Sequence, residues 1–182
     1  MTAILVNVIV IALLAGAYYA WQTLQGQPSK RWPKLAERLG LKYEGPPPRL
    51  TGPWKNRQVT IQLDGERASA SFPVRKPEGL RLEIGPREEV EKAAGIVVPD
   101  RVDFNDPSSL AFNQRYMVRC KPQALAASVL DPVMRQRIMA IEGFHVLAEA
   151  GRLTVPVDPG ADSDGIQVVL DLAASLLDGL EA

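Results

Sequence analysis

Hydrophobic residues fill the first 21 positions of the chain almost without interruption, and beyond them hydrophobic and polar residues alternate. Residues 3–21 carry no charged side chain, and Asn7 interrupts the apolar run. As a helix rising about 1.5 Å per residue, this segment spans about 28 Å, close to the hydrocarbon thickness of a bilayer. The pattern predicts a transmembrane helix over residues 1–21, followed by a polar linker over residues 22–31.

No basic residue precedes the apolar run, although a cleaved secretory signal requires a positively charged segment there. We therefore expect the small residues Ala15–Ala17 to escape cleavage, and the helix to remain as the signal anchor of a single-pass protein of the cell membrane. Aromatic residues favour the membrane interface, and basic residues collect on the cytoplasmic side. The predicted interfacial residues are Tyr18, Tyr19, Trp21, Lys30 and Arg31. They place the soluble domain in the cytoplasm.

Three small residues repeat every four positions in the predicted membrane helix: Ala12, Gly16 and Ala20. They share one helix face, where small side chains let a second helix approach closely enough for extensive van der Waals contact. This spacing predicts a helix–helix partner or a homo-oligomer. Because small residues are common in membrane helices, a ridge without a partner is the alternative.

The clearest alternation predicts a β-hairpin. Hydrophobic and polar residues alternate over Gln58–Leu63 and over Glu66–Phe72, and Asp64-Gly65 between them is a favoured two-residue turn. This turn pairs Val59 with Ala70, Thr60 with Ser69, and Ile61 with Ala68. The register puts the apolar side chains on one face and the polar ones on the other.

Further segments have the period of a helix or of a strand. Short helices are predicted over Trp32–Leu39, Arg87–Ala94, Gln123–Leu130 and Val133–Ile141, the last with Asp131 as its N-cap. Strands are predicted over Leu80–Ile84, Tyr116–Cys120, Phe144–Ala150 and Leu153–Val157, and the last two form a hairpin around Gly151-Arg152.

The last helix, predicted over Ser163–Leu180, has the most regular pattern. Its apolar residues form one stripe: Ile166, Val169, Leu170, Ala173, Leu176, Leu177 and Leu180. The stripe needs an apolar partner, and the inner face of the sheet is the obvious one. Together the elements predict an α+β domain over residues 32–182, with a mainly antiparallel sheet and helices packed on one face.

The chain carries 21 basic and 21 acidic residues, so no overall field attracts nucleic acid, and we expect no nucleic-acid partner. The two signs are separated along the chain. Residues 22–60 hold eight basic residues and two acidic ones, whereas residues 158–182 hold six acidic residues and no basic one. A single cysteine and a single histidine exclude an internal disulfide framework and a Cys/His zinc site. We expect neither a cofactor nor a bound metal.

Three aspartates at every third position, Asp100, Asp103 and Asp106, are the candidates for metal-dependent or hydrolytic chemistry, since grouped carboxylates bind metals or divide acid and base roles. The same residues suit a turn, in which Asp and Asn side chains accept backbone hydrogen bonds. His145 is a candidate base, with a solvated or locally hydrogen-bonded side chain as the alternative. Cys120 is expected to be a small buried hydrophobic residue.

Asp162–Gly165 partly matches a calcium-binding loop, but that loop's two most demanding ligand positions hold Gly160 and Asp171. Capping of the last helix by Asp162 or Ser163 explains the same residues better. The sequence contains no Walker loop, no G-x-G-x-x-G motif and no G-x-S-x-G motif. We therefore assign no catalytic and no metal-binding residue.

These observations favour a non-enzymatic interaction or accessory domain held at the membrane, as a subunit or assembly factor of a membrane complex. Two alternatives stay open. One is a small metal-dependent or hydrolytic enzyme that uses the aspartate group or His145. The other is a receptor for a lipid or small apolar ligand, which an apolar cavity between the sheet and the helices would favour.

The run Phe112–Pro132, the apolar helix after it and the leucine-rich last helix resemble a pattern found in uncharacterised bacterial single-pass membrane proteins. The resemblance extends from about residue 112 to the end of the chain. It implies a membrane anchor followed by an α+β domain, and it implies no activity and no functional residue.

A reporter enzyme that is active only in the periplasm, fused after Ala182, tests the predicted orientation. Because basic residues flank the C-terminal side of the predicted span, we expect this fusion to be inactive and a matched cytoplasmic reporter to be active. Activity of the periplasmic reporter would place the domain on the opposite side of the membrane.

Overall fold

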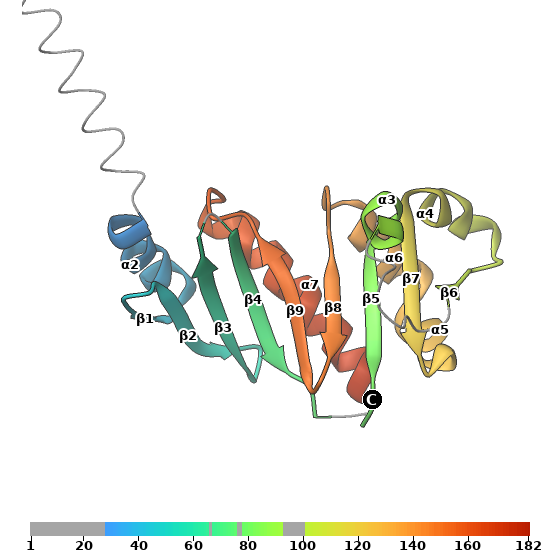
Figure 1. Ribbon diagram of the computed structural model, residues 1–182, viewed down its shortest axis with the longest axis horizontal. Helices are drawn as coiled ribbons and strands as arrows, with labels where there is room; N and C mark the ends of the chain where they lie inside the picture. Colours follow the sequence, from blue (N-terminus) through green and yellow to red (C-terminus); the bar gives the residue numbers. More distant parts are fainter. Residues whose placement is uncertain (1–27, 66, 76–77, 93–100) are drawn as a thin grey trace, which may run out of the picture.

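Within the described residues, nine strands form one sheet in which every neighbouring pair is antiparallel (Figure 1). The computed structural model describes residues 28–65, 67–75, 78–92 and 101–182. The strands are β1 (Lys42–Glu44), β2 (Arg49–Trp54), β3 (Arg57–Asp64), β4 (Arg67–Pro73), β5 (Arg81–Pro86), β6 (Arg101–Val102), β7 (Tyr116–Lys121), β8 (Val146–Glu149) and β9 (Arg152–Val157). The predicted α+β class with a mainly antiparallel sheet is confirmed.

The predicted membrane helix lies outside the described residues. So do its small residues Ala12, Gly16 and Ala20 and its aromatic residues Tyr18, Tyr19 and Trp21. In the part of the chain that the structure describes, no helix combines the length and the apolar character needed to cross a bilayer.

The strand order is β1-β2-β3-β4-β9-β8-β5-β7-β6. Strands β1 to β4 follow one another along the chain, whereas the late β8–β9 hairpin lies between β4 and β5 (Figure 1). Glu149 pairs with Arg152 in this hairpin, so the turn consists of Ala150 and Gly151 and lies one residue before the predicted Gly151-Arg152 turn. Backbone pairing of β4 with β9 and of β5 with β8 therefore joins the early strands to the later ones.

The β3–β4 hairpin is confirmed, but the predicted register was wrong by two residues. Asp64 pairs with Arg67, Ile61 with Ala70, and Thr60 with Ser71, so the connection consists of residues 65–66. Gly65 has a φ of 60°, a left-handed conformation that glycine adopts without steric cost and that tight hairpin turns require. Because side chains alternate with a period of two, the shift leaves every side chain on its predicted face.

The helices are α2 (Pro28–Leu39), α3 (Arg87–Lys92), the 3₁₀ turn η1 (Pro107–Ser109), α4 (Leu110–Arg115), α5 (Gln123–Val129), α6 (Pro132–Met139) and α7 (Ser163–Glu181). The predicted N-cap Asp131 is present, and of the two candidate caps for the last helix, Asp162 and Ser163, the structure has Asp162. The Asp131 carboxylate accepts a hydrogen bond from the Met134 backbone N–H at 2.7 Å, and Asp162 accepts one from Gly165 at 2.8 Å. Each satisfies a backbone donor that the helix itself leaves free.

Helix α2 begins at Pro28, four residues before its predicted start, so residues 28–31 are helical rather than linker. Arg31 supplies a physical reason. From its helical position the guanidinium donates to the backbone carbonyls of Gly160 and Ala161, at 2.5 Å each. The extra turn is therefore attached to the loop that precedes α7, which the residue pattern around Pro33 did not indicate.

Helix α7 buries the predicted apolar stripe against one face of the sheet. Leu170, Ala173 and Leu177 have no exposed surface. The core facing them includes sheet residues Ile61, Ala70, Phe72, Ile84, Val146, Ala148, Leu153 and Val155. Each leucine or phenylalanine buried in this way contributes about 1.5–3 kcal/mol to stability. Helices α2, α5 and α6 also contact α7, so this face of the sheet carries the core.

Helix α3 contradicts the prediction that the helices cover one face only. It contacts β5 and β7. Leu82 and Ile84 of β5 point into the core, so Gly85 turns to the opposite face. A Cβ atom on Gly85 would lie 2.9 Å from Val90 Cγ2 of α3. The missing side chain of Gly85 therefore makes the room in which fully buried Val90 packs.

The turn between β2 and β3 is attached to α7 by charged groups. Trp54 Nε1 and Lys55 Nζ each lie 3.0 Å from Asp171 Oδ1. About two and three turns further along the helix, Asp178 and Glu181 accept hydrogen bonds from Arg57, at 2.8 and 2.7 Å. Basic residues from the early part of the sequence thus pair with acidic residues of α7, near the end of the chain.

Glu181 is the most protected carboxylate of this contact. Burial alone would raise its pKa, but the hydrogen bond from the Arg75 backbone N–H, at 2.6 Å, and the pairing with Arg57 outweigh burial and hold the pKa below its ordinary value. Because the pKa is lower in the folded state, the stabilisation is fully present above the unfolded-state pKa of about 4.3. It is lost as the pH falls through the folded-state value.

We expect Glu181→Gln to lower the free energy of unfolding at neutral pH by about 1–2 kcal/mol, since a partly buried charge-assisted hydrogen bond is weakened. The variant should also lose less stability than the wild type when the pH is lowered below about 4.3. Urea unfolding at several pH values measures both quantities.

Asp178→Asn is the matched control, because Asp178 contacts the same arginine but its side chain is 68% exposed. Its effect should stay within about 0.5 kcal/mol. Equal effects of the two substitutions, or an unchanged acid dependence in Glu181→Gln, would contradict this assignment.

Candidate functional site

One row of side chains runs across the sheet from edge to edge on the face opposite α7. Successive cross-strand pairs connect the nine residues, one from each strand of the described sheet. In spatial order they are Lys42, Thr51, Thr60, Ser71, Thr154, Leu147, Glu83, Arg119 and Arg101. We call this set the cross-strand row. Its second to fifth members carry short hydroxyl side chains, and all the others except Leu147 are charged.

The hydroxyl part of the row occupies β2, β3, β4 and β9. Thr51, Thr60, Ser71 and Thr154 are neighbours in register, and all four are half-buried. The described residues place no helix over these four strands on this side (Figure 1). We call this surface the open face. Along these four residues of the cross-strand row the side chains are short, so that a partner can approach the backbone closely there and still meet hydroxyl donors and acceptors.

The other part of the same face lies beside α3. His145 Nε2 lies 3.1 Å from Glu83 Oε1, and His145 Nδ1 lies 3.6 Å from Glu89 Oε2. Glu83 belongs to the cross-strand row, whereas Glu89 belongs to α3. The histidine therefore links the sheet to the helix, and no group of three metal-ligating side chains suited to a metal ion occurs among the described residues.

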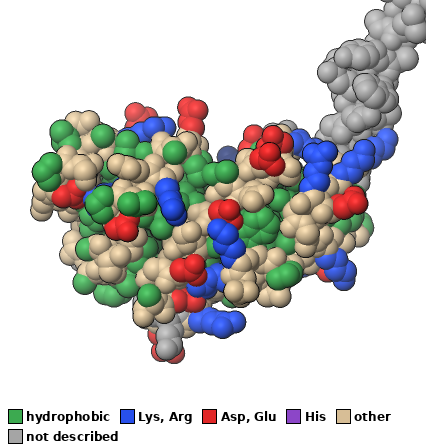
Figure 2. All heavy atoms as spheres, turned by 180° about the vertical axis from the view of Figure 1, so that it is seen from behind, with side chains coloured by type: hydrophobic (Ala, Val, Ile, Leu, Met, Phe, Trp, Pro, Cys, Tyr) green, Lys and Arg blue, Asp and Glu red, His purple; other side chains and the backbone are tan. Residues whose placement is uncertain are grey.

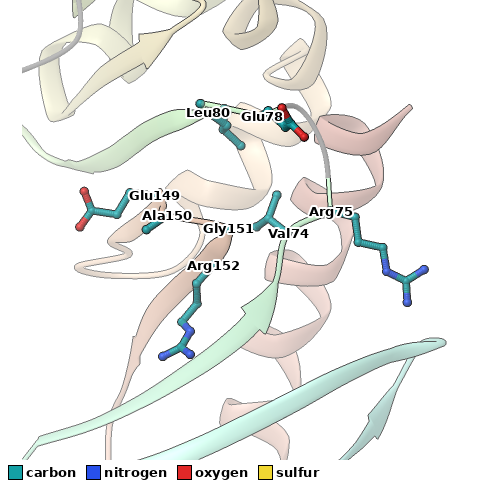
Figure 3. Close-up of a pocket in the computed structure, with 9 residues that line it drawn as sticks. Val74, Arg75, Glu78, Leu80, Glu149, Ala150, Gly151 and Arg152 are labelled. Atoms are coloured by element: carbon teal, nitrogen blue, oxygen red, sulfur yellow. The ribbon is translucent and has the colours of Figure 1, made fainter.

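A cavity of 310 Å³ opens where β4 ends, β5 begins and the β8–β9 turn comes close to both. Figure 3 shows Val74 and Leu80 facing this space from opposite sides, while the Arg75 side chain points away. Charged residues at the margin are Arg75, Glu78, Glu149 and Arg152. The cavity combines an apolar interior with charges of both signs.

The β8–β9 turn forms one wall of this cavity. Ala150 and Gly151 have φ values of 50° and 73°, as a two-residue hairpin turn requires. A second depression of 380 Å³ shares Glu149, Ala150 and Arg152 with the cavity and adds Leu147 and Thr154 of the cross-strand row. The depression therefore leads from the turn onto the open face.

The residues predicted at the membrane interface are described only in part. Lys30 is exposed, and Arg31 is half-buried by its bonds to Gly160 and Ala161. Tyr18, Tyr19 and Trp21 lie outside the described residues, as stated above. The predicted interface and the predicted helix-packing ridge stay predictions.

The described aspartate candidates each pair with a different arginine. Asp100 lies outside the described residues, Asp103 pairs with Arg101 at 2.8 Å, and Asp106 pairs with Arg135 at 2.7 Å. Asp106 also accepts a hydrogen bond from the Ser108 hydroxyl. This bond, followed by the attraction of Arg135, holds the pKa of Asp106 below its ordinary value. The described aspartates therefore belong to a local turn and an ion pair, as the turn interpretation predicted.

Cys120 is buried, as predicted, and its thiol donates to the Pro122 carbonyl at 3.2 Å. Burial raises the pKa of the thiol, so the uncharged form that is poor as a nucleophile is favoured.

Sequence reasoning did not find the open face as a site. The alternation of Thr60 and Ser71 with apolar residues indicated that these hydroxyls face away from the core. The pattern held no sign that four hydroxyl residues from β2, β3, β4 and β9 lie side by side, because Ser71 and Thr154 are more than 80 residues apart in the chain.

The chain matches none of the protein-family models, and no curated protein matches it in sequence. Its structure is similar to the crystal structure of the mycobacterial trehalose monomycolate transport factor A, TtfA, with a TM-score of 0.59 and 12% sequence identity. The similarity covers 83% of this chain and 93% of that protein's chain. At this identity the likeness shows a shared fold.

The packing of α3 on the outer face can be tested at Gly85. A Cβ atom there would lie 2.8 Å from His145 Cδ2 and 2.9 Å from Val90 Cγ2, so both side chains must move. We expect Gly85→Ala to lower the free energy of unfolding by about 1–3 kcal/mol, the usual effect of overpacking. Urea unfolding measures it.

Ser71→Ala, on the same face but beyond α3, serves as the control and should change stability by less than about 0.5 kcal/mol. A Gly85→Ala variant as stable as the wild type would mean that α3 does not pack against β5 in this way.

Proposed function

We propose that this protein is a membrane-associated accessory domain that holds a protein partner on the open face of its sheet, as a subunit or assembly factor of a membrane complex. The cross-strand row is the observation that carries the proposal. A polar sheet face needs no partner to be stable. This one, however, joins a shallow row of hydroxyls to a depression and a cavity with charged margins, which gives a partner both a flat contact area and a point of attachment.

The composition of the open face suits a protein partner that binds reversibly. Non-obligate interfaces are about as polar as ordinary protein surface, with hydrogen bonds distributed across them. Thr51, Thr60, Ser71 and Thr154 offer such bonds without long side chains that would have to be ordered on binding. Arg152 and Glu149 at the turn add charges that can select the partner and fix its orientation.

Membrane association is supported by the apolar N-terminal sequence. The apolar segment over residues 1–21 predicts a single-pass anchor, and we place the domain in the cytoplasm because the basic residues follow that segment. The protein of similar fold is a transport factor for trehalose monomycolate. An accessory role in transport fits this likeness.

An accessory role also fits the described polar groups better than catalysis does. Asp103 and Asp106 each neutralise an arginine, and His145 bridges two glutamates that tie α3 to the sheet. In each case the structure gives the polar group a structural partner. The groups that a hydrolytic mechanism would need to bring together are engaged separately.

Site-specific photo-crosslinking in intact membranes tests the proposal. A photoreactive residue at Thr154 should form one discrete protein adduct, because its side chain lies in the cross-strand row. Ser71→Arg, introduced in the same chain, should reduce the adduct by about tenfold or more, since a buried unpaired charge at an interface is costly.

The matched controls are a photoreactive residue at exposed Ala127 of α5 and the substitution Ala127→Arg. The first should form no comparable adduct, and the second should leave the Thr154 adduct unchanged. Equal adducts from positions 127 and 154, or an adduct that survives Ser71→Arg, would overturn the proposal.

A further inference from the structure

A second surface lies on the helix side of the molecule, where the end of α6, the middle of α7 and the β2–β3 turn enclose a groove of 430 Å³. We call it the α6–α7 groove. Its apolar lining comes from Ala140, Ile141, Val168 and Leu172. Figure 2 shows the molecule from this side, with hydrophobic side chains exposed between groups of opposite charge. The groove belongs to neither the open face nor the cavity at the β8–β9 turn.

Val168 is the unusual residue of the groove. It is 54% exposed, although it lies on the same helix as the buried stripe and one turn from buried Leu172. Valine favours strands more than helices. Its place at the groove therefore has no explanation in the stability of α7 alone. An apolar occupant would remove this surface from water and gain about 25 cal/mol per Å² of apolar surface buried.

The charges at the rim determine which apolar occupant fits. Asp171 is engaged by Lys55 Nζ and by Trp54 Nε1, both at 3.0 Å. Arg137 is exposed and forms no ion pair with the described residues. Lys55 thus neutralises Asp171, and the charge of Arg137 is not balanced by a described acidic residue. The rim therefore attracts an anion.

A polar cavity of 420 Å³ continues beyond Lys55, which lines both spaces. Arg57 and Arg75 lie in this second cavity, together with Asp178 and Glu181. An apolar slot that borders directly on a polar, partly basic space suits a molecule with one apolar and one polar end. The volume of the groove lies in the range of small-molecule sites, which is about 300–1,000 Å³.

We propose that the α6–α7 groove binds a single-chain anionic amphiphile of the long-chain carboxylate class. The acyl chain lies against Val168, Ile141 and Leu172, and the carboxylate faces Arg137 and Lys55. A predicted anchor at the N-terminus would keep the groove close to a membrane, the source of such molecules, and raise their effective concentration.

The test uses the full chain in nanodiscs of phosphatidylcholine, with labelled methyl groups observed by NMR. The probe is stearate carrying a nitroxide on its chain, at a pH at which the carboxyl group is ionised. We expect saturable broadening of the Val168, Ile141 and Leu172 methyl signals. Val133 should stay sharp, although it lies on the same helix as Arg137 and is 56% exposed.

Substitutions at Val168 and Arg137 test the two ends of the proposed site, and Val133→Glu is the control. Val168→Glu should weaken the binding of the probe by about tenfold or more. The new carboxylate would be costly to bury under the acyl chain, and it would repel the anionic probe. Val133→Glu, its match in residue type and exposure, should change the affinity by less than about twofold. Arg137→Ala should weaken binding of the stearate probe by about fivefold, while binding of its uncharged methyl ester stays unchanged.

Several results would overturn the proposal. One is equal broadening of Val133 and Val168, which would indicate general partitioning into the lipid. Another is equal loss of affinity in Val168→Glu and Val133→Glu. Equal affinity for the stearate probe and its methyl ester in the wild type would remove the anionic part of the assignment. A far-UV circular dichroism spectrum like that of the wild type, recorded for each variant, ensures that a loss of binding is not a loss of fold.

Discussion

The fold depends on the burial of one helical stripe. Helix α7 presents Leu170, Ala173 and Leu177 to the sheet, and all three lose their entire exposed surface there. Because the helix contacts α2, α5 and α6 as well as β9, it holds early and late parts of the chain on one core. Burial of this stripe also decides which face of the sheet is the outer one. The candidate site exists because the hydroxyl residues lie on the face that α7 leaves free.

Charge reinforces this arrangement where the apolar contact ends. Arg57 is only 16% exposed and pairs with Asp178 and Glu181, while Lys55 and Trp54 hold Asp171. These contacts thus hold the β2–β3 turn against α7. The same contacts build a wall of the α6–α7 groove and neutralise its acidic residue. A structural ion pair therefore contributes to the charge of a proposed binding site.

The two faces of the molecule offer different chemistry. The open face has short hydroxyl side chains in cross-strand register, which suits hydrogen bonding to a flat protein surface. The helix side has an exposed valine in an apolar slot beside an arginine that forms no ion pair with the described residues, which suits an amphiphile. A domain held at a membrane could use both at once, because binding on one face leaves the other accessible.

Much of the local structure was determined by the sequence alone. The stripe of α7, the cap by Asp131 and the presence of the two hairpins depend on residues close together in the chain, and all were predicted. Asp162 was one of two predicted caps for the last helix. The faces of β3 and β4 were right even though the register was wrong by two, because a period of two is insensitive to that shift. Only the tertiary structure decided the rest. The β8–β9 hairpin enters between β4 and β5, α3 packs on the outer face in the space left by Gly85, and Arg57 finds acids more than 120 residues away. The cross-strand row arises from those long-range pairings, and no single strand contains more than one of its residues.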